Sequence, residues 1–220
     1  MKMTSTSSFT LVLALCLAAG VFGFTGCCVA QRDGIGANAL TPIFNGKDLT
    51  GWKAPDPNPF WKVADGVLVG ENDEANKGSM LWTEKSYGDF VLECEARWSG
   101  EIDSGILFRE SNNRKRQLQL QLGISRSQKR DLTGSFFTGG KEKYPEAGEV
   151  KNLEKFIKPD VWNKYRLEAK GDTFTVWLNG KQAVEYVNTN FAGVGPIGLQ
   201  VHPGLPMKIE FRNIRARVLE

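Results

Sequence analysis

The order of hydrophobic and polar positions along the chain predicts a protein built of β-strands. Residues 90–98 alternate between apolar side chains and a charged series that includes Glu93 and Glu95, and residues 117–122 alternate between leucine and glutamine without a break. A period of two places the two series on opposite faces of a strand. Beyond residue 30, no apolar repeat of 3.6 residues persists for more than a turn or two. We therefore expect few and short helices.

Two hairpins stand out because a turn dipeptide separates two extended segments. Asp-Gly and Asn-Gly readily take the positive φ angles of a type I′ turn. The hairpins are 61–64, Asp65-Gly66 and 67–69, then 173–178, Asn179-Gly180 and 182–186. Further strands are predicted at 80–83, 90–98, 104–109, 117–122, 162–169, 195–202 and 207–218. Such dense strands without an internal repeat predict an all-β, two-sheet antiparallel sandwich.

The long segment 123–158 breaks this regularity, since it is polar and rich in glycine. Long irregular connections within a compact domain are often functional loops.

Polar side chains recur on one face of two predicted strands. Residues 195–202 carry Gln200 and His202, the only histidine, opposite an apolar face. Gln117, Gln119 and Gln121 repeat in the same way on the other strand. Amide and imidazole groups both donate and accept hydrogen bonds, which suits sugar hydroxyls. The two strands therefore either floor a polar cleft or present ordinary solvated faces.

Aromatic side chains that stack on a sugar face would complete such a site, although each of them is equally a candidate for the core. The candidates are Trp61, Trp82, Phe136 and Phe137.

The first 30 residues indicate an export signal, with Lys2 followed by an apolar run that is short for a membrane span. Cleavage before Cys27 would follow a lipobox-like sequence and leave Cys27 lipidated, whereas cleavage after Ala30 would be ordinary signal processing. Residues 31–41 are predicted to be a flexible tether and 42–220 a single domain. These features predict a protein of the periplasm or cell surface, with a possible lipid anchor as its membrane contact.

Composition adds to this interpretation at two points. The chain has 28 Lys and Arg against 25 Asp and Glu, scattered along its length, which argues against nucleic acid as a partner. Its 24 glycines, 13 phenylalanines and 6 tryptophans are typical of tight turns and aromatic-rich strands.

Cys94 is the only cysteine of the predicted domain. We expect it to be a small buried core residue rather than a disulfide partner or a reactive thiol.

Several kinds of chemistry are disfavoured. Glu93 and Glu95 would lie roughly 7 Å apart on one strand face, within the range of a glycosidase pair, but a solvated charged face fits their surroundings better. One histidine cannot make a multi-histidine zinc site. A divalent cation held by carboxylates and carbonyls stays open, so the cofactor is undetermined.

A set of motifs in fixed order resembles the 3-keto-disaccharide hydrolase family over about residues 42–220. The motifs are residues 44–52 (FNGKDLTGW), 61–68 (WKVADGVL), 81–83 (LWT), 87–90 (YGDF), 103–106 (DSGI) with Arg109, Trp162-Asn163, 178–180 (LNG), 195–200 (GPIGLQ) with His202, and 211–214 (FRNI). The resemblance implies a concanavalin A-like jelly-roll sandwich in an exported bacterial protein.

The resemblance also implies activity on glycosides that are oxidised to a ketone at C3. Such a ketone acidifies the hydrogen on C2, so that the group on C1 departs by elimination and water then adds. This route needs a base, an acid and a group that stabilises the enolate oxygen. The rival interpretation is a carbohydrate-binding module without catalysis, for which a lectin-like fold is equally suitable.

Candidate roles follow from the resemblance. His202 is the candidate base or acid, Arg109 or a bound cation would stabilise the enolate, and Asp103 would act beside them or ligate a metal. Substrate contacts are expected from Gln117, Gln119, Gln121, Gln200, Trp82 and Glu71. The family often has carboxylates where this chain has Gln117 and Leu122. Glu71 or Asp131 would have to supply them.

Overall fold

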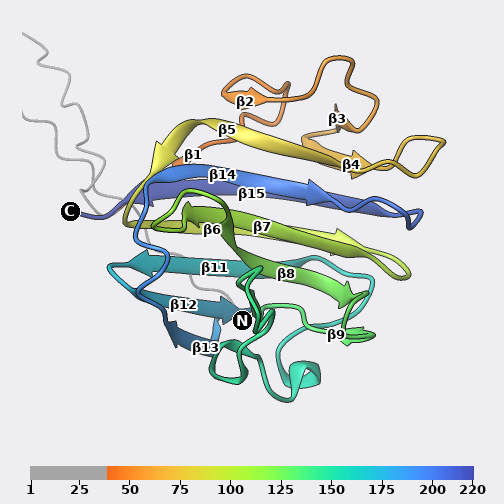
Figure 1. Ribbon diagram of the computed structural model, residues 1–220. Coiled ribbons are helices and arrows are strands. Elements are labelled where there is room, and N and C mark those ends of the chain that lie inside the picture. The colour runs from red at the N-terminus through yellow and green to blue at the C-terminus, as the bar shows by residue number, and fades with distance from the viewer. Residues whose placement is uncertain (1–38) are drawn as a thin grey trace, which may run out of the picture. The chain divides into compact units, whose positions relative to one another are not determined.

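The computed structural model describes residues 39–220, which form two antiparallel β-sheets packed face to face (Figure 1). The first sheet has the order β13 (Lys181–Val187), β12 (Thr173–Leu178), β11 (Asn163–Lys170), β6 (Phe90–Trp98), β15 (Lys208–Val218), β4 (Val67–Glu71) and β3 (Trp61–Ala64), with β1 (Thr41–Pro42) beside β15. The second has the order β10 (Phe136–Phe137), β8 (Gln117–Ser125), β7 (Asp103–Glu110), β14 (Gly195–Val201), β5 (Ser79–Tyr87) and β2 (Trp52–Lys53), with β9 (Arg130–Asp131) beside β8. The predicted two-sheet antiparallel sandwich is confirmed.

Helical structure in the described residues is limited to two 3₁₀ turns, η1 (Glu146–Gly148) and η2 (Leu153–Lys155). Both lie in the long segment between β8 and β11, where no strand pattern was found. No helix among residues 39–220 is long and apolar enough to cross a membrane. The predicted export signal, Cys27 and most of the predicted tether lie outside the described residues.

The core lies between the sheets and is filled by one side of each strand. The leucines of β8 are fully buried, and aromatic rings meet across the interface, with ring centroids of Phe108 and Phe174 5.9 Å apart. Cys94 is buried on β6, as predicted, and burial, together with the charges of Glu95 and Glu93, raises the pKa of its thiol to about 12. The thiol therefore stays protonated and unreactive.

Both predicted hairpins are present. Asp65 and Gly66 have φ angles of 52° and 78°, and Asn179 and Gly180 have 50° and 82°. These positive values are those of a type I′ turn, which matches the twist of the strands that it joins.

The outer face of the first sheet carries a network of ion pairs centred on Glu93. Its carboxylate pairs with Arg166 at 2.9 Å, Arg215 at 3.0 Å and Lys164 at 3.1 Å. Glu95 is held in the same way by Arg212. The other Glu95 oxygen accepts from the Asn213 amide, so both carboxylates are fully engaged on a face turned away from the core. The charged-face interpretation therefore holds and a glycosidase pair does not.

This network makes the free energy of unfolding depend on pH in the acidic range. Burial alone would raise the pKa of Glu93, but hydrogen bonds and charge from Arg166 and Lys164 outweigh it and hold the pKa below the usual value. A depressed carboxyl pKa stabilises the fold above the unfolded-state pKa of about 4.3, and this contribution is lost as pH falls through the folded-state pKa.

We expect Glu93→Gln to cost about 2 kcal/mol of unfolding free energy at pH 7 and to flatten the dependence of stability on pH below about 4.5. Urea denaturation at a series of pH values measures both effects. Glu168→Gln is the matched control, since its contact with Arg166 is longer, at 3.8 Å. Equal losses for the two variants would contradict the role given to Glu93.

Candidate functional site

Three neighbouring strands of the second sheet, β8, β7 and β14, present polar side chains on the outer face to one cavity of about 470 Å³. The segment after β8 provides its walls. The lining residues are Asp103, Gln119, Gln121, Ser125, Arg126, Ser127, Phe137, Lys143, Tyr144, Gln200 and His202. Five polar residues predicted from the sequence, four on the three strands and one directly after β14, are thus brought together: Asp103, Gln119, Gln121, Gln200 and His202.

Gly105 creates the space in which Gln119 lies. A Cβ at Gly105 would lie 2.4 Å from Gln119 Nε2 and 2.6 Å from its Cδ, so the amide rests directly on the glycine. From there Nε2 is 3.4 Å from both Gln200 Oε1 and Ser104 O. The Gln119 oxygen accepts no hydrogen bond from residues 39–220, and it is therefore available to a ligand hydroxyl.

Gln121 organises the floor, because all its hydrogen-bonding groups are engaged. Its Nε2 donates to Asp103 Oδ1 at 2.9 Å and to the carbonyl of Ile124 at 3.1 Å. Its Oε1 accepts from Gln119 Nε2 at 3.0 Å and from the Tyr144 hydroxyl at 2.8 Å. Gln121 therefore fixes the positions of its neighbours rather than offering free groups to a substrate.

His202 follows directly after β14 and is held from two sides. Asn72 donates to its backbone carbonyl at 2.9 Å, and the ring Nδ1 lies 2.8 Å from the carbonyl oxygen of Pro203. A carbonyl can only accept, so Nδ1 carries the proton in this contact. The neutral imidazole then has its lone pair on Nε2, which can accept a proton from a ligand.

Arg126 is a site residue that the sequence did not indicate. Its backbone N–H donates to Asp103 Oδ2 at 3.1 Å, and its Nη1 donates to the Pro203 carbonyl, the oxygen that also holds His202, at 2.9 Å. It has no ion pair with any other described residue. The guanidinium is thus placed beside the imidazole with donor groups to spare.

Tyr144 was also missed. Burial raises the pKa of its hydroxyl to about 12, so the phenol remains protonated at neutral pH. Phe137 lies against it, with ring centroids 5.1 Å apart, and is the one predicted stacking candidate that lines the cavity. The only available signal for Tyr144 and Arg126 was their place in a long polar segment, because nothing in their spacing marks them.

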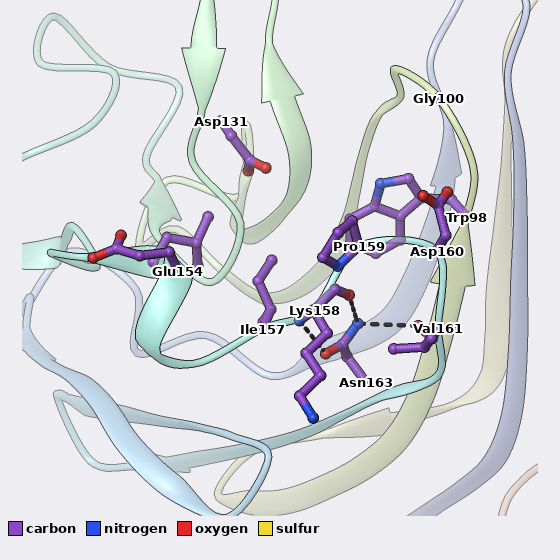
Figure 2. A pocket seen from close by; sticks show the side chains of 11 residues that line it. Trp98, Gly100, Asp131, Glu154, Ile157, Lys158, Pro159, Asp160, Val161 and Asn163 are labelled. Atoms are coloured by element: carbon purple, nitrogen blue, oxygen red, sulfur yellow. Dashed lines mark hydrogen bonds between the residues drawn. The ribbon is translucent and has the colours of Figure 1, made fainter.

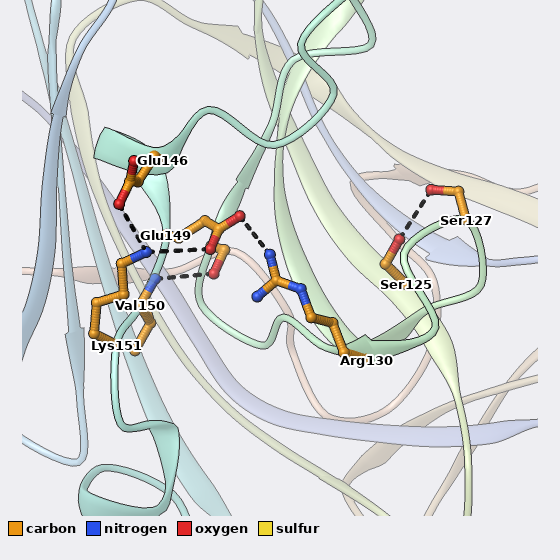
Figure 3. Close-up of polar contacts among 8 residues, drawn as sticks. Ser125, Ser127, Arg130, Glu146, Glu149, Val150 and Lys151 are labelled. Atoms are coloured by element: carbon orange, nitrogen blue, oxygen red, sulfur yellow. Dashed lines mark hydrogen bonds and ion pairs between the residues drawn. The ribbon is translucent and has the colours of Figure 1, made fainter.

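Ion pairs tie the cavity wall together (Figure 3). Arg130, at the end of the β8–β9 hairpin, contacts Glu149 at 2.6 Å, and Lys151 lies 3.5 Å from the same carboxylate. At the tip of this hairpin the hydroxyls of Ser125 and Ser127 are 3.1 Å apart. These contacts fix the hairpin that carries Arg126 and the segment that follows Tyr144.

The structure places Arg109 away from this cavity, contrary to the expected role as enolate stabiliser. Its side chain is 4% exposed and donates to Asp89 at 2.8 Å and to the carbonyls of Gly171 and Phe191 at 2.9 and 3.0 Å. Because these bonds engage its donor groups inside the fold, Arg109 joins three segments of the chain instead of facing a ligand.

Gln117, Trp82 and Glu71 do not line the cavity either. Gln117 is at the opposite end of β8, beside Glu110, and the Trp82 ring covers Gly198. Glu71 pairs with Lys62 at 3.2 Å, at the edge of the first sheet. The position of Gln117 follows from the length of β8, since residues on one face of a strand are spread along the whole strand. Glu71 belongs to the other sheet.

The cavity does not fit a cation site made of carboxylates. Among residues 39–220 no group of three or more His, Cys, Asp or Glu could hold a metal ion. Both oxygens of Asp103 already accept hydrogen bonds, Leu122 is buried in the core, and Asp131 lines a different cavity. We therefore derive no chemical step through a metal.

Gly105→Ala tests the placement of Gln119. The added methyl has no room beside the amide, so Gln119 must swing away and the floor of the cavity is disturbed. We expect about ten-fold weaker binding of a sugar ligand with a loss of less than about 1.5 kcal/mol in stability. Calorimetric titration and urea denaturation measure the two effects. Gly88→Ala is the control, since its nearest neighbour is at 3.4 Å; equal binding by the two variants would refute the assignment.

The family of 3-keto-alpha-glucoside-1,2-lyase-like domains matches residues 39–217 of this chain. The chain belongs to this family. The resemblance drawn from the ordered motifs is thereby confirmed. Membership of the lyase-like family supports a carbohydrate-related function and a glycosidase-like enzyme.

Solved structures show the same fold at low sequence identity. A putative glycosyl hydrolase from Parabacteroides distasonis ATCC 8503 is 23% identical, with a TM-score of 0.60 over 84% of this chain and 95% of that one. The carbohydrate binding module CBM66 from Bacillus subtilis is 18% identical, with a TM-score of 0.54 over 76% and 95%. A Bacillus subtilis protein of unknown function with a galectin-like fold is 12% identical, with a TM-score of 0.58 over 82% and 94%.

These likenesses confirm the lectin-like jelly-roll sandwich that the motifs implied. No curated protein is significantly similar to the chain.

Proposed function

We propose that this protein cleaves glycosides that carry a ketone at C3 of a glucosyl unit, by elimination followed by addition of water. The observation that supports it best is the position of His202. Its Nδ1 is held by a carbonyl, its Nε2 is free to take a proton, and hydrogen-bond donors for a developing oxyanion lie beside it.

The carboxyl content of the cavity favours this route over ordinary glycoside hydrolysis. Retaining and inverting glycosidases of the usual kind need two carboxyl groups about 5 to 9.5 Å apart. Among residues 39–220, Asp103 is the only carboxyl residue that lines this cavity, and both its oxygens are engaged. An elimination needs a base and an oxyanion site instead, and the lining supplies both.

The proposed sequence begins when His202 Nε2 removes the proton from C2. The C–H electrons form an enolate whose oxygen, at C3, accepts hydrogen bonds from Arg126 and from the Gln200 amide. The enolate collapses, a C1–C2 double bond forms and the C1–O bond breaks. The Tyr144 hydroxyl gives up its hydrogen bond to Gln121 Oε1 and protonates the leaving oxygen. Water then adds to C1 and loses a proton to the Tyr144 oxygen, and the His202 imidazolium returns a proton to C2, so the net reaction is hydrolysis.

The experiment compares p-nitrophenyl 3-keto-glucoside with the unoxidised p-nitrophenyl glucoside. We expect release of nitrophenol from the ketone only, together with a transient absorbance of the unsaturated ketone in single-turnover experiments. Exchange of the C2 hydrogen with solvent deuterium during turnover checks the proton removal. Equal rates on the two glucosides, or retention of the C2 hydrogen, would rule the mechanism out.

A carbohydrate-binding module is the second candidate. It is favoured by the amide-lined floor and by Gln117 and Leu122, which stand where the family often has carboxylates. In the same experiment it predicts saturable binding of the ketone without any release of nitrophenol.

We also propose that the chain is exported and processed at Cys27 as a lipoprotein. The supporting observation is the Gly-Cys pair directly after the apolar run at residues 11–24. Mass spectrometry of the mature protein tests this, since acylation of Cys27 and its loss in Cys27→Ala are expected. A mature chain that begins at Gln31 would contradict it.

A further inference from the structure

A second cavity, of about 600 Å³, lies at one end of the sandwich and shares no lining residue with the first. It is bounded by the end of β6, the start of β11, β9 and the segment that follows η2 (Figure 2). The tip of the β8–β9 hairpin lines the first cavity and the end of the hairpin lines the second. Neither the proposed reaction nor the family description uses it.

One wall is held rigidly by a buried amide. Asn163 is 3% exposed, and its side chain donates to the carbonyls of Lys158 at 2.7 Å and Val161 at 3.0 Å. Its oxygen accepts from the Lys158 N–H at 2.9 Å and from Asn179 at 2.8 Å. Three of these hydrogen bonds fix the segment that carries Pro159 and Asp160, the fourth ties Asn163 to Asn179, and the wall is pre-formed.

The opposite side presents an oriented carboxylate. Asp131 Oδ1 accepts from the backbone N–H and the hydroxyl of Thr133, at 2.9 and 2.6 Å, and this leaves Oδ2 without a partner among the described residues. Figure 2 shows the Asp131 carboxylate directed toward the space above Ile157. A ligand that enters this space meets a fixed hydrogen-bond acceptor.

The Tyr165 hydroxyl adds an orphaned polar group at this end of the core. Tyr165 follows Asn163 by two residues on the same face of β11, and its hydroxyl is buried without a hydrogen-bond partner in the described chain. Burial, with further contributions from Cys94 and Asp131, raises its pKa well above the usual value, so it stays a neutral donor. Tyr165 is not among the residues that line the cavity, so its hydroxyl adds to the polarity of this end of the core and is not a direct ligand contact.

The remaining lining is mostly apolar, with two acidic residues, Glu154 and Asp160. Trp98 provides an indole surface, with Leu153, Ile157 and Val161 around the space, and Asp160 lies beside the indole in Figure 2. The lining as a whole contains three carboxyl residues, Asp131, Glu154 and Asp160, and one cation, Lys158. This excess of negative charge disfavours anionic ligands. An aromatic surface beside carboxylates matches a pyranose ring, which has a C–H face and hydroxyl donors.

We propose that this cavity is a second glycan-binding site, which takes a neutral pyranose unit with its C–H face on Trp98 and its hydroxyls on Asp131 and Asp160. It holds a glycan chain independently of the site around His202. Its affinity is that of a typical weak sugar site, with Kd of ~1 mM.

The test is a titration of ¹⁵N-labelled protein with cellotetraose and with maltotetraose, two neutral 1,4-linked glucans of opposite anomeric configuration. We expect at least one of them to shift the signals of the Trp98 indole N–H and the Asn163 side-chain amide. Trigalacturonic acid, an anionic probe, is expected to leave both signals unchanged. The proposal is overturned if neither glucan shifts these signals, or if the acidic trimer shifts them equally.

Variants keep the test independent of folding. Asp131→Asn retains the shape of the side chain, and Trp98→Ala removes the indole surface; each is expected to weaken Kd about ten-fold. Asp65→Asn, in the β3–β4 turn, is the matched acidic control, and His202→Ala controls for the first cavity. Unchanged affinity in Asp131→Asn and Trp98→Ala, or a loss in His202→Ala equal to theirs, would refute the assignment.

Discussion

Replacement of His202 by alanine is expected to lower kcat/KM for a chromogenic 3-keto-glucoside by ~10²–10⁴-fold, the usual contribution of a positioned general base. The loss is expected mainly in kcat, because the amide groups of Gln119 and Gln200, which we propose as sugar contacts, remain in place. The fold is expected to survive, since the ring is partly exposed and makes one hydrogen bond, to the adjacent residue. Steady-state kinetics and a urea denaturation curve measure the two quantities.

Two features make this result specific. Added imidazole is expected to restore part of the activity in His202→Ala, which no purely structural role would allow. Gln128→Ala, an exposed change in the β8–β9 turn, is the matched control and is expected to keep wild-type rates. Activity of His202→Ala within three-fold of wild type, in a folded protein, would eliminate His202 as the base.

The fold was largely predictable because its signals are local. Residues 90–98 and 117–122 alternate between apolar and polar side chains with a period of two, which is visible in the sequence itself. The dipeptides Asp65-Gly66 and Asn179-Gly180 determine their turns by conformational preference alone. These features need no knowledge of distant residues. For the same reason the polar faces of β8 and β14 could be assigned, although their adjacency through β7 could not.

The candidate site was only half predictable, because its walls come from irregular chain. The glutamines of β8 were predicted to lie either in a polar cleft or on a solvated face, and Gln119 and Gln121 are 6% and 1% exposed, since the segment after β8 folds over them. The position of such a segment depends on long-range contacts such as that between Arg130 and Glu149. No short-range pattern encodes these contacts, so Arg126 and Tyr144 escaped notice.

Arg109 shows the reverse error, in which a motif residue is mistaken for a functional one. An arginine four residues beyond Gly105, a strand glycine of the site, looks like an oxyanion donor. Its φ of 49°, in the left-handed region, turns it instead into the interior toward Asp89 and two carbonyls. A buried arginine of this kind serves the fold, and sequence alone does not separate that role from catalysis.

The two arginines can be separated by experiment. Arg126→Gln is expected to lower kcat on the 3-keto-glucoside by ~10²–10³-fold with little change in KM, because a donor to the enolate oxygen acts only as charge develops. Arg109→Gln is expected to lose about 3 kcal/mol of unfolding free energy, since it strands buried acceptors, while the folded fraction keeps its kcat. Kinetics corrected for the folded fraction and urea denaturation give the two values.

Two further variants fix the interpretation. Arg126→Lys retains the charge and is expected to recover part of kcat, whereas a role in holding the hairpin alone would show no such dependence on charge. Arg116→Gln is the matched control, because this exposed arginine also bonds a loop carbonyl, that of Gly139, at 3.1 Å but does not line the cavity. The opposite result would be a loss of stability in Arg126→Gln and a loss of kcat in Arg109→Gln. That result would identify Arg109 as the oxyanion donor and refute the mechanism proposed for the first cavity.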